Sequence, residues 1–544
     1  MKITQHFIKG TSVISLLHED KTQYVCCLIN GRMRELTYVF DQDMDAEVEF
    51  LGIDDPQGAK IYEASIRFLT AMAIKAIDAR LDVKFFYNIS RSLFCRVITS
   101  KGIYKVTPSF VQRVDDKMKE LVSADLAMNR TRVSKKEALK IYHQHRFVDK
   151  EKVLSYRSED FVHLYECKNG IQYYDYLYSY LVPSTGYLKH YKIQFYAPGF
   201  VLQYPRAEFQ GTIPEFHDET KFALTLASTS KWAEGNGLDT VSNINHFIKQ
   251  HGDMALINLC EARVNNMLAD LGNAIVTQPN PIRLICIAGP SSSGKTSFAN
   301  RVLFELMSRG LRPVRISMDD FYIPRAQLPE GTDLESLEAI DVPLFNDTMM
   351  KLIAGESVQM PYYDFKGGLR KFGKSLHLDE NSPIIIEGIH ALNSRLNTEI
   401  PQTQKYKIYI SPQPQVNIDN HTPVSMTDMR LIRRIARDAR TRDSDARETI
   451  DMWPNVRHGE FKYIYPTQEN ADFVFDSFMP YEPCALRNTV LPLLNKIKPC
   501  DPQYPVAQRL KSLIKYFLPI ASNDIPCNSL IREFVGGSSF KDAR

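Results

Sequence analysis

The sequence predicts an α/β domain with a parallel sheet and flanking helices, preceded by a small β-rich domain and an α+β domain. In the C-terminal half, apolar runs such as RLICIA at 283–288 and PIIIE at 383–387 alternate with helical segments, which is typical of a buried parallel sheet. Near the N-terminus, strand-like runs lie beside Asn30–Gly31, a strong turn signal. Between these regions, 82–225 mixes short strands with helices and is rich in aromatic residues at 162–204.

Changes in pattern along the chain give its expected division. Short strands at 24–30 and 47–51 indicate a β-rich domain over 1–60, and helical spacing at 57–80 begins a second domain over 61–225. Residues 226–280 form a helical linker that ends at the Pro-rich stretch 277–281. The α/β domain then occupies 281–495, with further strands expected at 313–317 and 405–410. A tail over 496–544 contains a helix near 505–517.

Length and net charge limit the number of domains and the kind of partner. The 544 residues are enough for two to four domains of about 100–200 residues each. The 67 basic and 64 acidic residues leave a charge of +3, whereas a protein that binds nucleic acid through its phosphates usually carries a larger basic excess. Global charge therefore argues against nucleic-acid binding, although it leaves a local basic patch open.

Cysteine usage and hydropathy indicate the compartment. The nine cysteines are scattered and form no C-x-x-C pair, which predicts reduced thiols rather than a zinc ribbon or a thioredoxin motif. No apolar run approaches the ~18 residues of a membrane span. The N-terminal residues alternate in polarity, unlike a signal peptide. We therefore expect a cytoplasmic protein that does not interact with membranes.

The stretch GPSSSGKT at 289–296 matches the phosphate-binding pattern G-x-x-x-x-G-K-[ST]. It lies between a buried strand and an expected helix over 297–310, so the backbone N–H groups and the helix N-terminus would face bound phosphates. Lys295 would reach the terminal phosphates, and the Thr296 hydroxyl would bind Mg²⁺. The expected nucleotide-binding residues are Gly289, Ser291, Ser292, Ser293, Gly294, Lys295, Thr296 and Ser297.

Carboxylates follow two of the expected strands. Glu387 ends the strand at 383–387, which suits a ligand of Mg²⁺. Asp319 and Asp320 follow the strand at 313–317, and one of them would accept the proton of a hydroxyl that receives phosphate. The alternative function for either aspartate is helix capping.

An arginine-rich helix is expected at 430–442, where Arg430, Arg433 or Arg434, Arg437 and Arg440 share one face. Such a face would stabilise charge during phosphoryl transfer, as a lid or an arginine finger does. The alternative is a solvated helix whose arginines pair with Asp438 and Asp443.

These motifs together resemble the uridine kinase/phosphoribulokinase family of P-loop kinases. The matching segments are GPSSSGKT, SMDDFY, PYYDF at 361–365, IIIEGI and RLIRRIARDARTR, which cover about 285–475. The resemblance implies ATP or GTP as phosphate donor, with Mg²⁺ held by Thr296 and Glu387. It implies Asp319 as the base, with Lys295, Arg437 and Arg442 also catalytic. It assigns substrate binding to Asp341, which would hold ribose hydroxyls, and to Tyr363, Phe365 and Arg434.

The sequence also departs from the pyrimidine kinases of this family. Gly368 stands where they carry a histidine, and Met452 stands before Trp453 where they carry a base-reading glutamine. The lid sequence Gly-Arg-Asp is replaced by residues 443–445, Asp-Ser-Asp. Because a base edge is read by specific hydrogen bonds, these departures leave the preferred base open.

The N-terminal half resembles the TGS domain and the second additional, or editing, domain of threonyl-tRNA synthetase over about 1–225. The segments LINGRMREL, EASIRFLTAMAI and VPSTGYLKHYKI carry this resemblance. The family's four polar editing-site ligands align with Phe68, Met72, Leu177 and Leu181, so neither zinc binding nor editing is expected. The combined arrangement resembles the long bacterial uridine kinase-like proteins, whose tail is similar to SLIREFVGGSSF at 529–540.

The leading hypothesis is ATP-dependent transfer of the γ-phosphate to the 5′-hydroxyl of a nucleoside, uridine or cytidine. One alternative is a phosphoribulokinase-like sugar or sugar-phosphate kinase. The other is an RNA-binding or regulatory protein that uses ATP as a switch. A nucleoside is the expected partner, whereas RNA binding by the N-terminal half and homo-oligomerisation are left open.

Overall fold

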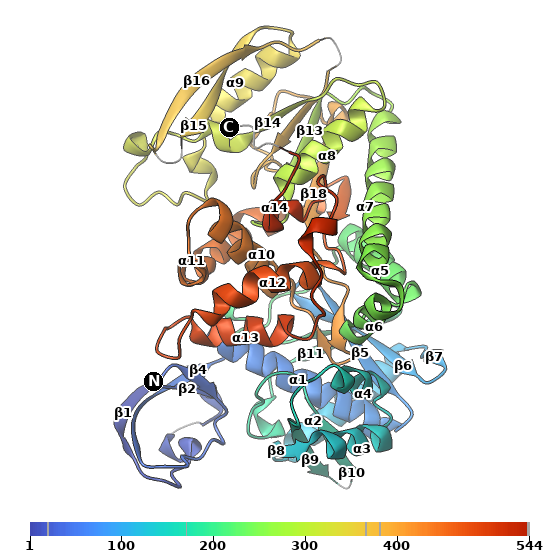
Figure 1. Ribbon diagram of the computed structural model, residues 1–544, viewed down its shortest axis with the longest axis vertical. Coiled ribbons are helices and arrows are strands. Elements are labelled where there is room, and N and C mark those ends of the chain that lie inside the picture. The colour runs from blue at the N-terminus through green and yellow to red at the C-terminus, as the bar shows by residue number, and fades with distance from the viewer. Residues whose placement is uncertain (19–20, 170, 365–366, 380–381, 541–544) are drawn as a thin grey trace.

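The computed structural model describes residues 1–18, 21–169, 171–364, 367–379 and 382–540. The β-rich N-terminal region lies at one end of the molecule, beside a mixed α+β region, and the parallel sheet of the C-terminal half lies toward the other end (Figure 1). In the part of the chain described, no helix combines the length and the apolar character that crossing a membrane requires.

The first region is a four-stranded sheet in the order β1-β4-β2-β3, in which all neighbouring strands are antiparallel. Asn30 and Gly31 form the turn between β2 and β3, and both have positive φ, as a two-residue hairpin turn requires. The β-rich region predicted near the N-terminus is therefore present, whereas its likeness to a TGS domain stays a prediction. The strands are β1 Lys2–Phe7, β2 Tyr24–Ile29, β3 Arg32–Arg34 and β4 Met44–Gly52.

The α+β region is organised around helix α1, Pro56–Ile77, whose N-terminus is capped by the Asp55 side chain. Sheets in the orders β11-β12-β6-β5 and β10-β9-β8 flank it, and β7 pairs with β6 in an antiparallel hairpin. The strands are β5 Asp82–Ile89, β6 Ser92–Thr99, β7 Gly102–Ile103, β8 Asn129–Ser134, β9 Phe161–Asn169, β10 Ile171–Asp175, β11 Lys192–Tyr196 and β12 Gly199–Gln203. The other helices are α2 Pro108–Ser123, α3 Lys135–His145 and α4 Val148–Ser155.

The four positions aligned with editing-site ligands lie in the apolar core of this region. Phe68, Met72, Leu177 and Leu181 are buried in the same cluster. The ring of Phe68 packs edge-on against Tyr173, with 5.0 Å between the ring centroids. Core packing therefore accounts for the apolar side chains at these positions. That purified protein carries no zinc stays a prediction, which elemental analysis would check.

The helices of 226–280 pack on the C-terminal domain. Helix α5, Thr220–Gly235, contacts strand β21. Helix α7, Asp253–Val276, runs along α8 (Figure 1). Helix α6, Val241–His251, lies between α5 and α7 in the chain. Side chains of α7 share one apolar core with the central strands of the parallel sheet. This segment, expected to be a linker, is therefore built into the surface of the domain that follows it.

The predicted parallel sheet is confirmed. Its order is β14-β17-β13-β18-β21, and every neighbouring pair is parallel. The strands are β13 Leu284–Ala288, β14 Val314–Ser317, β17 Ile384–Glu387, β18 Lys405–Ser411 and β21 Phe473–Asp476, and only the last lies outside the strands expected from sequence. The strands β13 and β17 are buried at every residue, which explains their continuous apolar sequences.

Helices and hairpins surround this sheet. Strands β15 Val358–Asp364 and β16 Leu369–Leu376 form an antiparallel hairpin that projects from one end of the molecule (Figure 1). A shorter pair is β19 Asn417–Asp419 with β20 Thr422–Pro423. The helices are α8 Lys295–Met307, α9 Val342–Ile353, α10 Met426–Thr441, α11 Ala446–Gly459, α12 Glu482–Asn495, α13 Tyr504–Ile514 and α14 Arg532–Val535.

A buried network of charges joins the α+β region to the C-terminal domain. Lys150 on α4 contacts Asp175 at 2.7 Å and Asp419 at 2.9 Å. His421 contacts Asp175 at 2.5 Å and Asp82 at 2.9 Å. Although burial lowers the pKa of His421, the neighbouring Asp175 and Asp82 raise it to about 10. The network thus holds two cations against three carboxylates away from water.

Lys150→Met is expected to lower the free energy of unfolding by about 3–5 kcal/mol, because it removes the cation that contacts two buried carboxylates, Asp175 and Asp419. Urea unfolding of the full chain would measure the change. Lys152→Met is the matched control, since Lys152 lies on the same helix and is exposed. Equal effects of the two substitutions would contradict a special contribution from the network.

Candidate phosphate-binding and phosphoryl-transfer site

The loop between β13 and α8 curls around the side chain of Lys295. The Lys295 Nζ donates hydrogen bonds to the carbonyls of Gly289 at 2.8 Å and Pro290 at 3.1 Å. A Cβ at Gly289 would lie 2.1 Å from the Ile410 carbonyl oxygen, so that position accepts only glycine. Gly294, which precedes the helix, has φ +89°, a conformation that also favours glycine. The two motif glycines are therefore required by the shape of the loop.

The loop offers hydrogen-bonding groups that suit a bound phosphate. Among the described residues, the hydroxyls of Ser292 and Ser293 are buried without a hydrogen-bond partner. The first N–H groups of α8 also lack acceptors within the helix. Since an unsatisfied buried donor is costly, an anion with several acceptor oxygens would stabilise this loop. These residues therefore fit the phosphates of a nucleotide.

Acidic and basic side chains meet at the carboxyl edge of the sheet. Ser317 pairs in register with Glu387, so Asp319, in the 3₁₀ turn Met318–Phe321, follows β14 at the level where β17 ends. Burial and the nearby Asp319 raise the pKa of Glu387 to about 7, against the opposing effect of Lys295. Burial lowers the pKa of Lys295, against the opposing effects of Glu387 and Asp319. Three predicted site residues thus lie within electrostatic reach of one another.

The adjacent aspartates Asp319 and Asp320 have different surroundings. Asp319 is exposed, and its charge favours a higher pKa for Lys295 and for Glu387. Asp320 accepts a hydrogen bond from the backbone N–H of Tyr363 at 3.4 Å, and so joins the turn to the β15–β16 hairpin. This arrangement agrees with the expectation that one carboxylate faces the phosphate site, while the role of Asp319 as a base stays a prediction.

Glu387 and Thr296 present oxygen atoms, which are the ligands that Mg²⁺ prefers. Among the described residues, no three acidic, histidine or cysteine side chains form a group able to hold a metal alone. Mg²⁺ in kinases is held by one or two carboxylates together with substrate phosphates. The donor set therefore fits Mg²⁺ that enters with a nucleotide.

The raised pKa of Glu387 has a measurable consequence for stability. Between the ordinary value of 4.5 and the folded value of about 7, folded protein keeps a proton that the unfolded chain has released. The free energy of unfolding should therefore fall as pH rises through this window. Glu387→Gln should remove that slope and, above pH 7, stabilise nucleotide-free protein by up to about 3 kcal/mol.

Urea unfolding of the wild type and of Glu387→Gln across this pH range would measure the difference between them. Glu330→Gln, which alters an exposed residue, is the control. The same pH dependence in the wild type and in Glu387→Gln would rule out Glu387 as its source.

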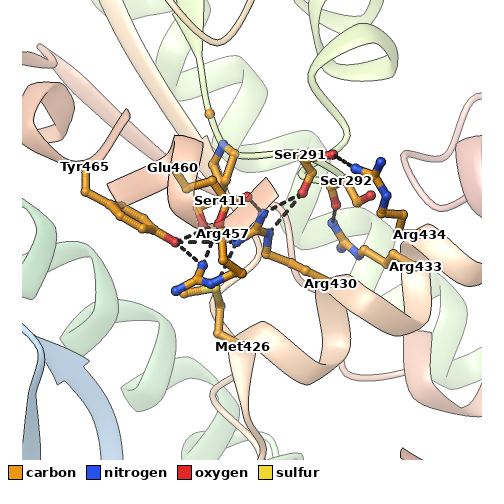
Figure 2. A network of polar contacts seen from close by, with 12 residues as sticks. Ser291, Ser292, Ser411, Met426, Arg430, Arg433, Arg434, Arg457, Glu460 and Tyr465 are labelled. Carbon is orange, nitrogen blue, oxygen red and sulfur yellow. Dashed lines mark hydrogen bonds and ion pairs between the residues drawn. The ribbon is translucent and has the colours of Figure 1, made fainter. Parts of the chain in front are cut away.

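The arginine-rich helix α10 packs beneath the phosphate loop (Figure 2). Arg430 donates to the Ser291 carbonyl at 3.0 and 2.8 Å and is ion-paired with Glu460. Arg433 donates to the Ser292 and Ser293 carbonyls at 3.2 and 3.3 Å. Both arginines are buried. They support the backbone of the loop, which differs from the predicted position of Arg430 and Arg433 on a helix face directed at phosphates.

The other three arginines of the expected transfer site meet at one buried carboxylate. Asp438 lies 3.2 Å from Arg434, 2.7 Å from Arg437 and 3.6 Å from Arg442. Arg434 also donates to the Ser291 hydroxyl at 2.8 Å, which places it at the loop. The alternative of a solvated helix correctly named Asp438 as a partner, but Asp438 is buried and gathers the three guanidinium groups. Their roles in transfer stay predictions.

Two of the predicted substrate residues, Asp341 and Tyr363, lie on the hairpin side of the site. Asp341 caps α9 through the Leu344 N–H at 3.1 Å and is ion-paired with Arg370 at 2.9 Å. Tyr363 lies on β15, with its ring centroid 5.5 Å from that of Tyr322. Phe365 lies outside the described residues.

Two further carboxylates reach the site: Glu335 lies in no sequence motif, and Glu533 lies in the tail segment 529–540, for which the sequence predicted no role in the site. Glu335 belongs to the segment between the 3₁₀ turn and α9; burial raises its pKa, and Arg434 and Lys295 oppose that shift. Glu533, in the C-terminal tail, accepts hydrogen bonds from Ser297. Both lie far from the loop in sequence, so no local pattern could have placed them there.

A phosphate loop between a buried parallel strand and a helix, with carboxylates at neighbouring strand ends, defines a P-loop phosphotransferase domain. Residues 284–482 match the sequence model of the Phosphoribulokinase / Uridine kinase family. This part of the chain is a domain of that family.

Curated relatives match about a third of the chain. A uridine kinase of Bacillus pumilus is 28% identical over 196 residues, which are 35% of this chain and 84% of the relative. A uridine kinase of Staphylococcus carnosus is 29% identical over 200 residues, or 36% and 87% of the two chains. The solved structure described as a possible uridine kinase from Bacillus stearothermophilus matches at 19% identity with a TM-score of 0.28, covering 39% of this chain and all of that one.

Proposed function

We propose that this protein transfers the γ-phosphate of ATP to the 5′-hydroxyl of a nucleoside, uridine or cytidine. The observation that carries the proposal is the position of Asp319, at the same sheet edge as Lys295 and Glu387 and close enough to affect the pKa of both. A protein that used ATP only as a switch would need no acceptor base there. Relatives named uridine kinases support the nucleoside as acceptor.

In this mechanism, the N–H groups at the start of α8 and the loop serines bind the nucleotide phosphates. Asp319 accepts the proton of the attacking hydroxyl, which requires the ionised carboxylate. Lys295 and the arginines gathered by Asp438 stabilise the charge that develops on the transferred group. Glu387 and Thr296 would hold Mg²⁺, which neutralises phosphate charge when bound.

A sugar or sugar-phosphate acceptor is the second candidate. Gly368 has no side chain to read a base, and Met452, at the other base-reading position, offers no strong hydrogen-bonding group. A pocket without these groups would discriminate less among acceptors that share a primary hydroxyl. Asp341 and Tyr363, which match the substrate-binding positions of the pyrimidine kinases, favour the nucleoside as acceptor.

A substrate panel separates these functions. Purified full-length protein would be given ATP or GTP with Mg²⁺ and, separately, pyrimidine nucleosides, purine nucleosides, ribulose 5-phosphate and other sugars. Phosphorylated uridine or cytidine is the expected product. Turnover with a sugar alone would establish the second candidate, and nucleotide binding without turnover of any acceptor would favour the ATP-switched RNA-binding or regulatory protein. We also propose that the reaction takes place in the cytoplasm. Whether the protein forms homo-oligomers is a separate question, which its molar mass in solution would answer.

A further inference from the structure

The C-terminal segment 528–540 lies against the helix that follows the phosphate loop (Figure 1). Its helix α14 packs on α10 and α12, and Leu530, Ile531 and Phe534 are buried in the core of the domain. The Arg301 guanidinium on α8 donates to the Asn528 carbonyl at 3.0 Å. The tail is therefore part of the wall around the site.

Within this segment, the carboxylate of Glu533 binds the N-terminus of α8. Its Oε2 accepts hydrogen bonds from the Ser297 hydroxyl at 3.0 Å and from the Ser297 backbone N–H at 3.4 Å. Ser297 is the third residue of α8, so its N–H is one of the four that have no acceptor within the helix. The negative charge of Glu533 also favours a higher pKa for Lys295 and for Glu387.

Other contacts also hold the backbone around Glu533. Arg440 on α10 donates to the Glu533 carbonyl at 2.7 Å, and the Arg433 guanidinium lies 4.9 Å from the ring centroid of Phe534. Gly536 and Gly537 follow with φ of +89° and +72°, a conformation open to glycine at little cost. The carboxylate can therefore leave Ser297 through a side-chain rotation or a small shift of the segment.

A bound nucleotide and Glu533 need the same donors. Phosphate oxygens bind the free N–H groups at the start of the helix in this kind of loop. Two anions that share one N–H repel each other, and the site already holds the carboxylates of Glu387 and Asp319. We propose that Glu533 is an internal competitor for nucleotide, so that nucleotide binding displaces its carboxylate from Ser297 and loosens the segment 529–537.

This inference rests on the nucleotide-binding part of the proposed function and not on the identity of the acceptor. Its test is the affinity of the full chain for ADP, measured by calorimetry, because ADP binds without turnover. Glu533→Gln keeps the size of the side chain, and Glu533→Ala removes the acceptor entirely. We expect Glu533→Ala to bind ADP about tenfold more tightly than the wild type does, because the competing hydrogen bond to a charged group is lost. Glu533→Gln should also bind ADP more tightly than the wild type, with a smaller gain than Glu533→Ala.

Asp524→Asn is the matched control, because it removes one negative charge from an exposed position in the same tail. ADP affinity should be the same in this control as in the wild type. A second readout is hydrogen exchange of 529–537 in the wild type, which should increase when ADP binds.

Unchanged or weaker ADP binding by both Glu533 variants would overturn the proposal, as would protection of 529–537 by ADP. Failure of every variant to bind ADP would refute nucleotide binding and this inference together. Tighter ADP binding by the variants, with no acceptor phosphorylated by any of them, would support the inference and overturn the proposed kinase function alone.

Discussion

Asp319→Asn is expected to lower turnover by about 10²–10⁴-fold, because an amide cannot take the proton that the carboxylate would accept. Nucleotide affinity should change little, since the loop and the N-terminus of α8 provide most of the phosphate contacts. Turnover and ADP affinity, measured side by side on the purified variant, would separate an effect on transfer from an effect on binding.

Asp320→Asn is the internal control for this prediction. It makes the same chemical change one residue away, at a side chain that bonds the Tyr363 backbone. Its effect on turnover should be far smaller. Equal, small effects of both substitutions would refute the acceptor-kinase function and favour a nucleotide switch, and a large effect from Asp320→Asn alone would move the base by one residue.

Lys295→Ala should reduce turnover by about 10²-fold or more and leave the fold intact. The ammonium would meet charge on the transferred group, and losing one such electrostatic donor costs about this much. Steady-state kinetics and near-ultraviolet circular dichroism would measure the two properties. Lys351→Ala, on the exposed side of α9, provides the control for removing one positive charge. Wild-type turnover by Lys295→Ala would show that 289–296 is not the phosphate site.

The strands of the parallel sheet could be predicted because burial on both faces leaves a continuous apolar signature. The segments 283–288 and 383–387 carry it, and they coincide with β13 and β17. Strand β21 was missed because its four residues, FVFD, are too short to be told from a buried loop or helix end. Phosphate-loop residues could be assigned because their backbone geometry, at Gly289 and Gly294, demands particular residue types.

Helix α10 shows what sequence periodicity can and cannot predict. Spacing indicates which arginines share a face, but it does not indicate what lies opposite that face. The buried carboxylates Glu460 and Glu482 pair with Arg430 and Arg433, and both arginines bond loop carbonyls instead of facing open space. The run was expected to face phosphates, with a solvated helix as the alternative, yet Arg430 and Arg433 are buried because their carboxylate partners come from segments later in the chain.

The sequence by itself determined four of the five strands of the parallel sheet, the phosphate loop and the carboxylates that follow two of those strands, because each depends on residues adjacent in the chain or on a shared strand end. Only the tertiary structure decided that Glu533 binds Ser297, 236 positions away, and that Lys150 is paired with Asp419, 269 positions away. Contacts of such separation leave no periodic trace, since neither partner's local geometry depends on the other until the chain has folded.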